Sequence, residues 1–154
     1  MKIDIAFNHL LQTRKNIIKV LQNNVQNSTV IPKGFNNSLL WNAGHCIAAQ
    51  QGLCYGLSAL PRNASNEFIN AFKKGSKAED IAIVISVDEL IKLLESTANQ
   101  IIKDYSDGKF KNYTQYETSY GITLNNIEEA IAFNNVHEGL HLGYMMAMAK
   151  GMNG

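Results

Sequence analysis

Two histidines near the C-terminal end of the chain stand in the pattern His-Glu-x-x-His, with His137 and His141 four positions apart. On a helix, this spacing places both imidazoles on one face, close enough to ligate one metal ion. The other residues of that face are apolar or aromatic, so the imidazoles are expected to point into the protein. One histidine on such a face is typically a core residue bonded to a carbonyl. Two favour a metal site, because several ring nitrogens would otherwise need partners in one place.

A third ligand has to come from upstream of this motif. In zinc proteases that carry the pattern, the glutamate acts as general base and a third ligand follows the motif. Here the chain after His141 contains no histidine or acid. His45 is the leading candidate, whereas His9 is expected to be an exposed surface histidine. Three neutral imidazoles leave coordination positions open for water or a thiol, and nitrogen ligands suit zinc, nickel or iron(II).

Two neighbours of the histidines have alternative interpretations. Glu138 could be a catalytic general base, but it is rotated by about 100° from His137 along a helix and could equally be a solvated surface acid. Trp41 precedes His45 by one turn and is a candidate wall of the binding pocket. Aromatic residues at helical spacing more often belong to the core, so both interpretations of Trp41 stay open.

Four helices are expected to position these residues. Apolar side chains recur at helical spacing, and capping patterns and proline mark the ends of helices, over residues 4–26, 38–60, 86–106 and 125–150. The third helix starts with a capping box from Ser86 to Glu89. The last starts with a cap formed by Asn125 and Glu128 and has Gly151 in the terminating position.

The connections between these helices are long. Residues 107–125 are rich in tyrosine and could include extended chain, and the role of residues 62–85 is not assigned. Two such crossings favour an all-α four-helix bundle with long crossover connections over a simple up-and-down bundle. With 154 residues, the chain is expected to form a single domain over 1–154.

Composition excludes several classes of protein. Hydrophobic residues make up 45% and charged residues 18%, which is typical of a folded globule, and the net charge of +1 gives no electrostatic reason to expect nucleic acid or an acidic membrane as partner. Neither a signal peptide nor a membrane-spanning stretch is apparent, so a soluble cytoplasmic protein is expected. Cys46 and Cys54 lie about 12 Å apart on one helix, too far for a disulfide, and are expected to be free thiols.

The second helix is unusually poor in charge. No aspartate, glutamate, lysine or arginine occurs between Lys33 and Arg62, so this helix must be covered on most sides. One apolar stripe can face the bundle core, and the opposite stripe, which contains Trp41 and His45, can face a pocket or a partner subunit. A homodimer is the simplest explanation, and the alternative is that a long loop covers the second face.

These residues together resemble the DinB-like superfamily of metal-binding four-helix bundles, and the resemblance extends over the whole chain. It rests on two motifs about ninety residues apart, Trp41-x-x-Gly44-His45 and His137-Glu138-x-x-His141-x-Gly143. The resemblance implies that His45, His137 and His141 bind a divalent metal, usually nickel or zinc, and that the protein forms a homodimer, as many members do. Characterised relatives include thiol-dependent S-transferases and isomerases that use bacillithiol, mycothiol or glutathione.

Three hypotheses for the function follow. The leading one is a metal-dependent enzyme that activates a low-molecular-weight thiol for S-transfer to a small-molecule substrate. The first alternative is a metal-dependent hydrolase, in which the metal supplies hydroxide and Glu138 shuttles the proton. The second alternative is a non-catalytic dimeric bundle that binds a metal or ligand.

Overall fold

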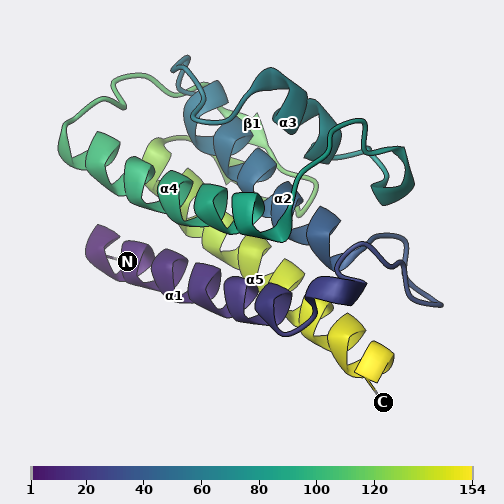
Figure 1. The fold of residues 1–154 in the computed structure, drawn as a ribbon. Coiled ribbons are helices and arrows are strands. Elements are labelled where there is room, and N and C mark those ends of the chain that lie inside the picture. The colour runs from purple at the N-terminus through teal and green to yellow at the C-terminus, as the bar shows by residue number, and fades with distance from the viewer. Residues whose placement is uncertain (1, 154) are drawn as a thin grey trace.

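Four long helices form a bundle in the computed structural model, which describes residues 2–153 except for the side chain of residue 153. They are α1 (Ile3–Gln22), α2 (Leu39–Gln50), α4 (Val87–Ser106) and α5 (Ile127–Asn153) (Figure 1). α1 and α2 each pack against both α4 and α5, so α1 and α2 occupy opposite corners of the bundle. The all-α fold predicted from the sequence is confirmed.

Both long connections contain structure of their own. Between α2 and α4, a short helix, α3 (Asn66–Phe72), lies against α2, and a 3₁₀ turn (Ala78–Asp80) follows it. Between α4 and α5, two short antiparallel strands, β1 (Tyr116–Glu117) and β2 (Thr123–Leu124), form the extended chain expected there. The segment that the sequence left unassigned therefore supplies a fifth α-helix.

The predicted helix ends agree with the structure in part. The Ser86 capping box is present, because Ser86 Oγ accepts from the Glu89 N–H at 3.1 Å and the Glu89 carboxylate accepts from the Ser86 N–H at 2.8 Å. The cap of α5 lies one residue later than predicted, since Asn126 Oδ1 accepts from the Glu129 N–H at 2.9 Å. Gly151 lacks the positive φ of a terminating glycine, and α5 continues through it. The first helix ends at Gln22, four residues earlier than predicted, and a 3₁₀ turn follows.

The helix predicted over residues 38–60 changes its form halfway. After α2 it continues as a π-helical segment, Gln51–Gly56, and Ala59, with a φ of 55°, ends it. A π-helical turn holds more residues per turn than an α-helix and therefore shifts which side chains face a given neighbour. Here it turns Gly52 and Leu53 toward the cavity described below.

The core consists of two apolar clusters with buried polar side chains between them. One cluster surrounds Ile17, Ile47 and Met145, and the other surrounds Leu10 and Ile131. The polar side chains that separate them along the bundle axis come from different helices, and all are buried: Arg14, Gln50, Thr97 and Glu138. The bundle interior is therefore not uniformly apolar.

The second face of α2 is covered within the single chain. Trp41, His45, Ala48 and Tyr55 are all buried, and α3 packs directly on this helix. The structure therefore agrees with the alternative, in which the connection between α2 and α4 covers this face, and the homodimer stays a prediction. Several large apolar side chains of α5 are exposed: Val136, Leu140, Tyr144 and Met146.

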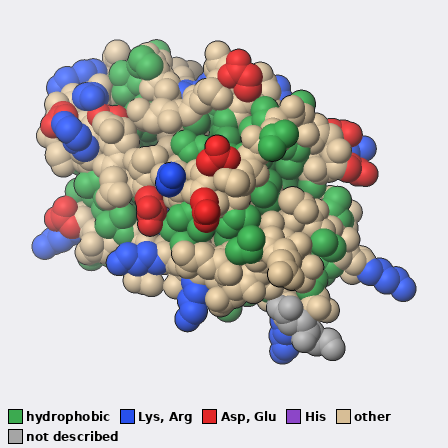
Figure 2. Space-filling model, viewed as in Figure 1, with side chains coloured by type: hydrophobic (Ala, Val, Ile, Leu, Met, Phe, Trp, Pro, Cys, Tyr) green, Lys and Arg blue, Asp and Glu red, His purple; other side chains and the backbone are tan. Residues whose placement is uncertain are grey.

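The surface carries mixed charge. On the face drawn in Figure 2, basic and acidic side chains are interspersed and form no large patch of one sign. Among the described residues, no helix combines the length and the apolar character needed to cross a membrane. Cys46 and Cys54 are free, as predicted, and both are fully buried.

Candidate metal centre

The three predicted ligands converge from two helices. His45 comes from α2, and His137 and His141 come from α5. One candidate ligand atom from each ring lies within 4.8 Å of the others, and the ring centroids are 4.6–5.1 Å apart. His45 is buried and the other two are partly buried, so the cluster lies between the helices rather than on the surface.

A hydrogen bond to the backbone orients the ring of His45. Its Nδ1 lies 2.7 Å from the backbone oxygen of Phe72, which is the last residue of α3. A carbonyl oxygen only accepts, so Nδ1–H is the donor and Nε2 keeps the lone pair that a metal requires. Gly44 allows this approach, because a Cβ at that position would lie 2.4 Å from the Phe72 ring. Gly44 thus allows the packing that orients the candidate ligand His45.

The tautomer of His141 follows from its partner Asn42. Nδ1 of His141 lies 2.8 Å from Asn42 Oδ1, and Asn42 Nδ2 donates to the Ser38 carbonyl at 2.8 Å. The amide orientation is therefore fixed, and the His141 Nδ1–H must donate to the amide oxygen. Nε2 of His141 is left with a lone pair, as in His45.

His137 completes the fit to a divalent ion. Its Nδ1 is buried, and no hydrogen-bond partner for it exists among the described residues. A buried polar atom without a partner is unfavourable and often marks the place of an ion or water. In His45 and His141, the hydrogen bond at Nδ1 leaves Nε2 available to a metal, and His137 has a nitrogen without a partner. This set of donor atoms fits zinc, nickel or iron(II).

Burial keeps the imidazoles neutral. Burial, together with a smaller effect of the neighbouring imidazoles, lowers the pKa of His137 to about 4 and that of His141 to about 3. The pKa of His45 is also below its ordinary value, because burial outweighs the hydrogen bond to the Phe72 carbonyl. At neutral pH, all three rings are therefore in the deprotonated form, which is the form that binds metals.

The metal-free protein is expected to lose stability as the pH falls from about 6.5 toward 4. An unfolded histidine titrates near pH ~6.5, whereas folded His137 and His141 titrate at about 4 and 3. Between these values the unfolded chain binds more protons, so protonation favours unfolding, and above this range the contribution is constant. Urea unfolding at several pH values measures this loss of stability in the wild type and in the double variant His137→Asn/His141→Asn. An equal pH dependence in both proteins would contradict the prediction.

Asn42 is a ligand-orienting residue that the sequence analysis missed. Replacing Asn42 with leucine is expected to weaken metal binding about 10–100-fold, because His141 then loses the acceptor that fixes its tautomer and ring orientation. Competition with a chromogenic chelator measures the affinity. Asn36→Leu is the matched control, since Asn36 borders the same hollow, is exposed and makes no hydrogen bond to the triad in the described part of the chain. Equal affinities for the two variants would refute the role.

Trp41 packs directly against one of the three imidazoles. Its ring is stacked on His45, with centroids 4.7 Å apart and planes 7° from parallel, and its Nε1–H donates to Ser76 Oγ at 3.0 Å. It borders a hollow of about 320 Å³ beside His141 rather than the cavity beside His45 and His137. Both interpretations of Trp41 apply in part, since it is buried and also contacts the site.

Glu138 is not a solvated surface acid. It is fully buried, and its two carboxylate oxygens accept from Arg14 Nε at 2.6 Å and Nη2 at 2.7 Å. Asn134 Nδ2 donates to the same carboxylate at 2.8 Å. The carboxylate thus faces α1, whereas His137 and His141 face α2, because neighbouring helix positions point in different directions. Among the described residues, no contact of Glu138 favours the general-base alternative.

Sequence reasoning also missed Arg14, although a signal for it exists. Arg14 falls on the apolar stripe of α1 between Leu10 and Ile17, where a charged residue is out of place unless it is paired inside the protein. The structure shows it 2% exposed, with further hydrogen bonds to the Leu94 carbonyl and Thr97 Oγ1. His9, by contrast, is exposed as predicted.

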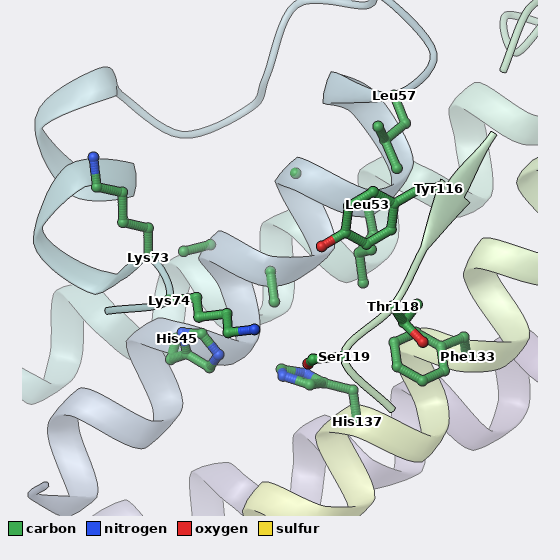
Figure 3. Close-up of a pocket in the computed structure, with 13 residues that line it drawn as sticks. His45, Leu53, Leu57, Lys73, Lys74, Tyr116, Thr118, Ser119, Phe133 and His137 are labelled. Carbon is green, nitrogen blue, oxygen red and sulfur yellow. The ribbon is translucent and has the colours of Figure 1, made fainter. Parts of the chain in front are cut away.

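An apolar cavity of about 320 Å³ opens beside the triad (Figure 3). His45 and His137 form one side of it. Leu53, Leu57 and Phe133 supply apolar wall, and residues around β1 close the opposite side. The candidate metal centre is therefore reached from a ligand-sized space on this side and from the hollow at Trp41 on the other.

The fold and the site together define the class of this protein. It is an all-α protein with a candidate metal centre, in which α2 and α5 bring three histidines together beside an apolar cavity. The family model of the DinB superfamily matches residues 9–145, a range that includes all three histidines, and the chain belongs to this superfamily. No curated protein matches the sequence.

Proposed function

We propose that this protein is a metal-dependent enzyme that activates a low-molecular-weight thiol for transfer to an electrophilic small molecule. The observation that carries the proposal is the triad itself, in which three neutral imidazoles would leave coordination positions open next to an apolar cavity. Nickel or zinc is the proposed metal, with iron as a further candidate, because all three ligands are imidazole nitrogens.

The thiol has to come from outside the chain. Cys46 and Cys54 are fully buried, and burial raises the pKa of both thiols. A divalent ion bound to the triad would hold an external thiol as thiolate, the nucleophilic form. Its sulfur then bonds to an electrophilic carbon, the bond from that carbon to the leaving group breaks, the leaving group takes the electron pair, and the thiol proton passes to solvent. The apolar wall limits the access of competing water.

The geometry supports the thiol hypothesis better than the hydrolase alternative. Hydrolysis would require a proton shuttle near the attacking water, and Glu138 was the candidate for it. Glu138 is held by Arg14, and no carboxylate is among the described residues that line the cavity. A thiolate nucleophile needs no such base.

A direct assay separates the alternatives. Metal-loaded protein is incubated with monochlorobimane and, in turn, with glutathione, bacillithiol and mycothiol, and then with p-nitrophenyl acetate without any thiol. We expect accelerated S-alkylation with at least one thiol, and loss of that acceleration in His137→Ala. Ester hydrolysis without thiol dependence would reject the transferase proposal in favour of the hydrolase. Metal binding without either activity would favour the non-catalytic bundle.

A homodimer is part of the same proposal and rests on the family resemblance. Because the second face of α2 is covered, the surface to test is the exposed apolar part of α5 around Leu140 and Tyr144. Light scattering coupled to size exclusion gives the mass of the wild type and of Leu140→Glu. A wild-type monomer would exclude the dimer.

A further inference from the structure

One lysine side chain extends into the space next to the candidate metal centre. Lys73 and Lys74 both border the cavity and follow directly after α3. In Figure 3 the Lys74 ammonium lies above the rings of His45 and His137, whereas Lys73 points away from them. Lys73 Nζ donates to Asn70 Oδ1 at 3.0 Å.

The cavity contains positive charge without a compensating acid. Within residues 2–153, Lys74 makes no ion pair, and no aspartate or glutamate lines the cavity. The nearest buried carboxylate in the motif, Glu138, is neutralised by Arg14. A divalent ion on three neutral imidazoles would add two further positive charges. Because apolar walls reduce dielectric screening, such a cavity attracts anions.

We propose that the cavity binds an anionic thiol, a small molecule whose thiol lies at the histidine triad and whose carboxylate pairs with Lys74. The placement of the thiol at the triad depends on the proposed function. The placement of the carboxylate depends on the charge and position of Lys74. Leu53 and Phe133 would contact the short apolar chain that joins the two ends. A volume of about 320 Å³ lies at the lower end of the range for ligand pockets, which suits a small ligand.

The β1–β2 turn adds hydroxyl groups but no charge to the wall of the cavity. Thr118 and Ser119 are the turn residues that border it. The Thr118 hydroxyl already donates to the Ile122 carbonyl at 2.8 Å, so it offers no proton to a carboxylate. Among the charged side chains that border the cavity, Lys74 is the one directed at the triad (Figure 3).

The test compares two thiols that differ only at one end. Protein loaded with Co²⁺ is titrated with 4-mercaptobutyrate and with 4-mercaptobutanol, and the sulfur-to-cobalt charge-transfer band reports binding of each. We expect the carboxylate to bind about tenfold more tightly, the size of one charge-assisted hydrogen bond. Lys74→Gln should abolish this preference. Lys73→Gln, which removes the same charge one residue away, should keep it.

The outcomes separate this proposal from the function on which it rests. If both thiols give the band with equal affinity, or if the preference survives in Lys74→Gln, the anionic-thiol proposal is overturned while thiol binding at the metal stands. If neither thiol gives the band, the proposed function fails and the anionic-thiol proposal fails with it. Cobalt stoichiometry and circular dichroism of each variant confirm that the metal centre and fold are intact.

Discussion

Replacing His141 with alanine is expected to lower the affinity for a divalent metal by about 100-fold or more, because three ligands become two. Structural four-ligand zinc sites bind with about 10–16 kcal/mol, so one ligand corresponds to about 3 kcal/mol. His141 is well suited to this test, since its Nδ1 is held by Asn42 and its side chain is only partly buried. The alanine leaves the helix intact, because alanine has the highest helix propensity.

Elemental analysis and chelator competition measure this effect. The wild type should bind about one divalent ion per chain, in keeping with one triad. His9→Ala is the matched control, since it removes an exposed histidine from α1, away from the triad, and should bind like the wild type. A wild-type protein purified without chelators that contains no metal, and takes up neither nickel nor zinc, would rule out the metal centre.

Replacing Arg14 with leucine is expected to reduce the free energy of unfolding by about 3–5 kcal/mol, the cost of leaving one member of a buried ion pair without its partner. Arg14 and Glu138 are 2% and 0% exposed and share two short hydrogen bonds, so water cannot replace the missing guanidinium. Replacing both residues with leucine should recover much of the loss, since an apolar pair leaves no buried charge.

Denaturant unfolding of the wild type, both single leucine variants and the double variant forms a double-mutant cycle. The exposed Glu95→Ala is the control and should change stability by no more than about 0.5 kcal/mol. The cycle also separates the two roles considered for Glu138. A structural carboxylate makes Glu138→Leu strongly destabilising, whereas a general base would leave stability nearly unchanged and abolish activity. Additive single effects would refute the coupling between Arg14 and Glu138.

The ligand triad could be predicted from the sequence because helical geometry is local. The four-residue spacing of His137 and His141 alone places two rings on one face, and the stretch without charge around His45 indicates a buried helix. The capping box at Ser86 and the absence of a disulfide between Cys46 and Cys54 could be predicted for the same reason, since each depends on residues close in the chain.

The features that the sequence did not reveal depend on distant partners. Glu138 looks like a surface acid until Arg14 is found 124 positions away along the chain. α3 has seven residues, too few to show a clear helical period, so neither this helix nor the position of Lys74 could be anticipated. Asn42 acquires its role only when α2 and α5 pack together.

The stacking of Trp41 on His45 gives the protein a built-in optical reporter. Trp41 is the only tryptophan in the chain, so its emission comes entirely from a ring 4.7 Å from a candidate ligand. An ion with a partly filled d shell, such as Ni²⁺, quenches a nearby indole, whereas closed-shell Zn²⁺ does not quench it in this way. The fluorescence of the unlabelled protein therefore distinguishes which ion occupies the centre as well as whether one is present.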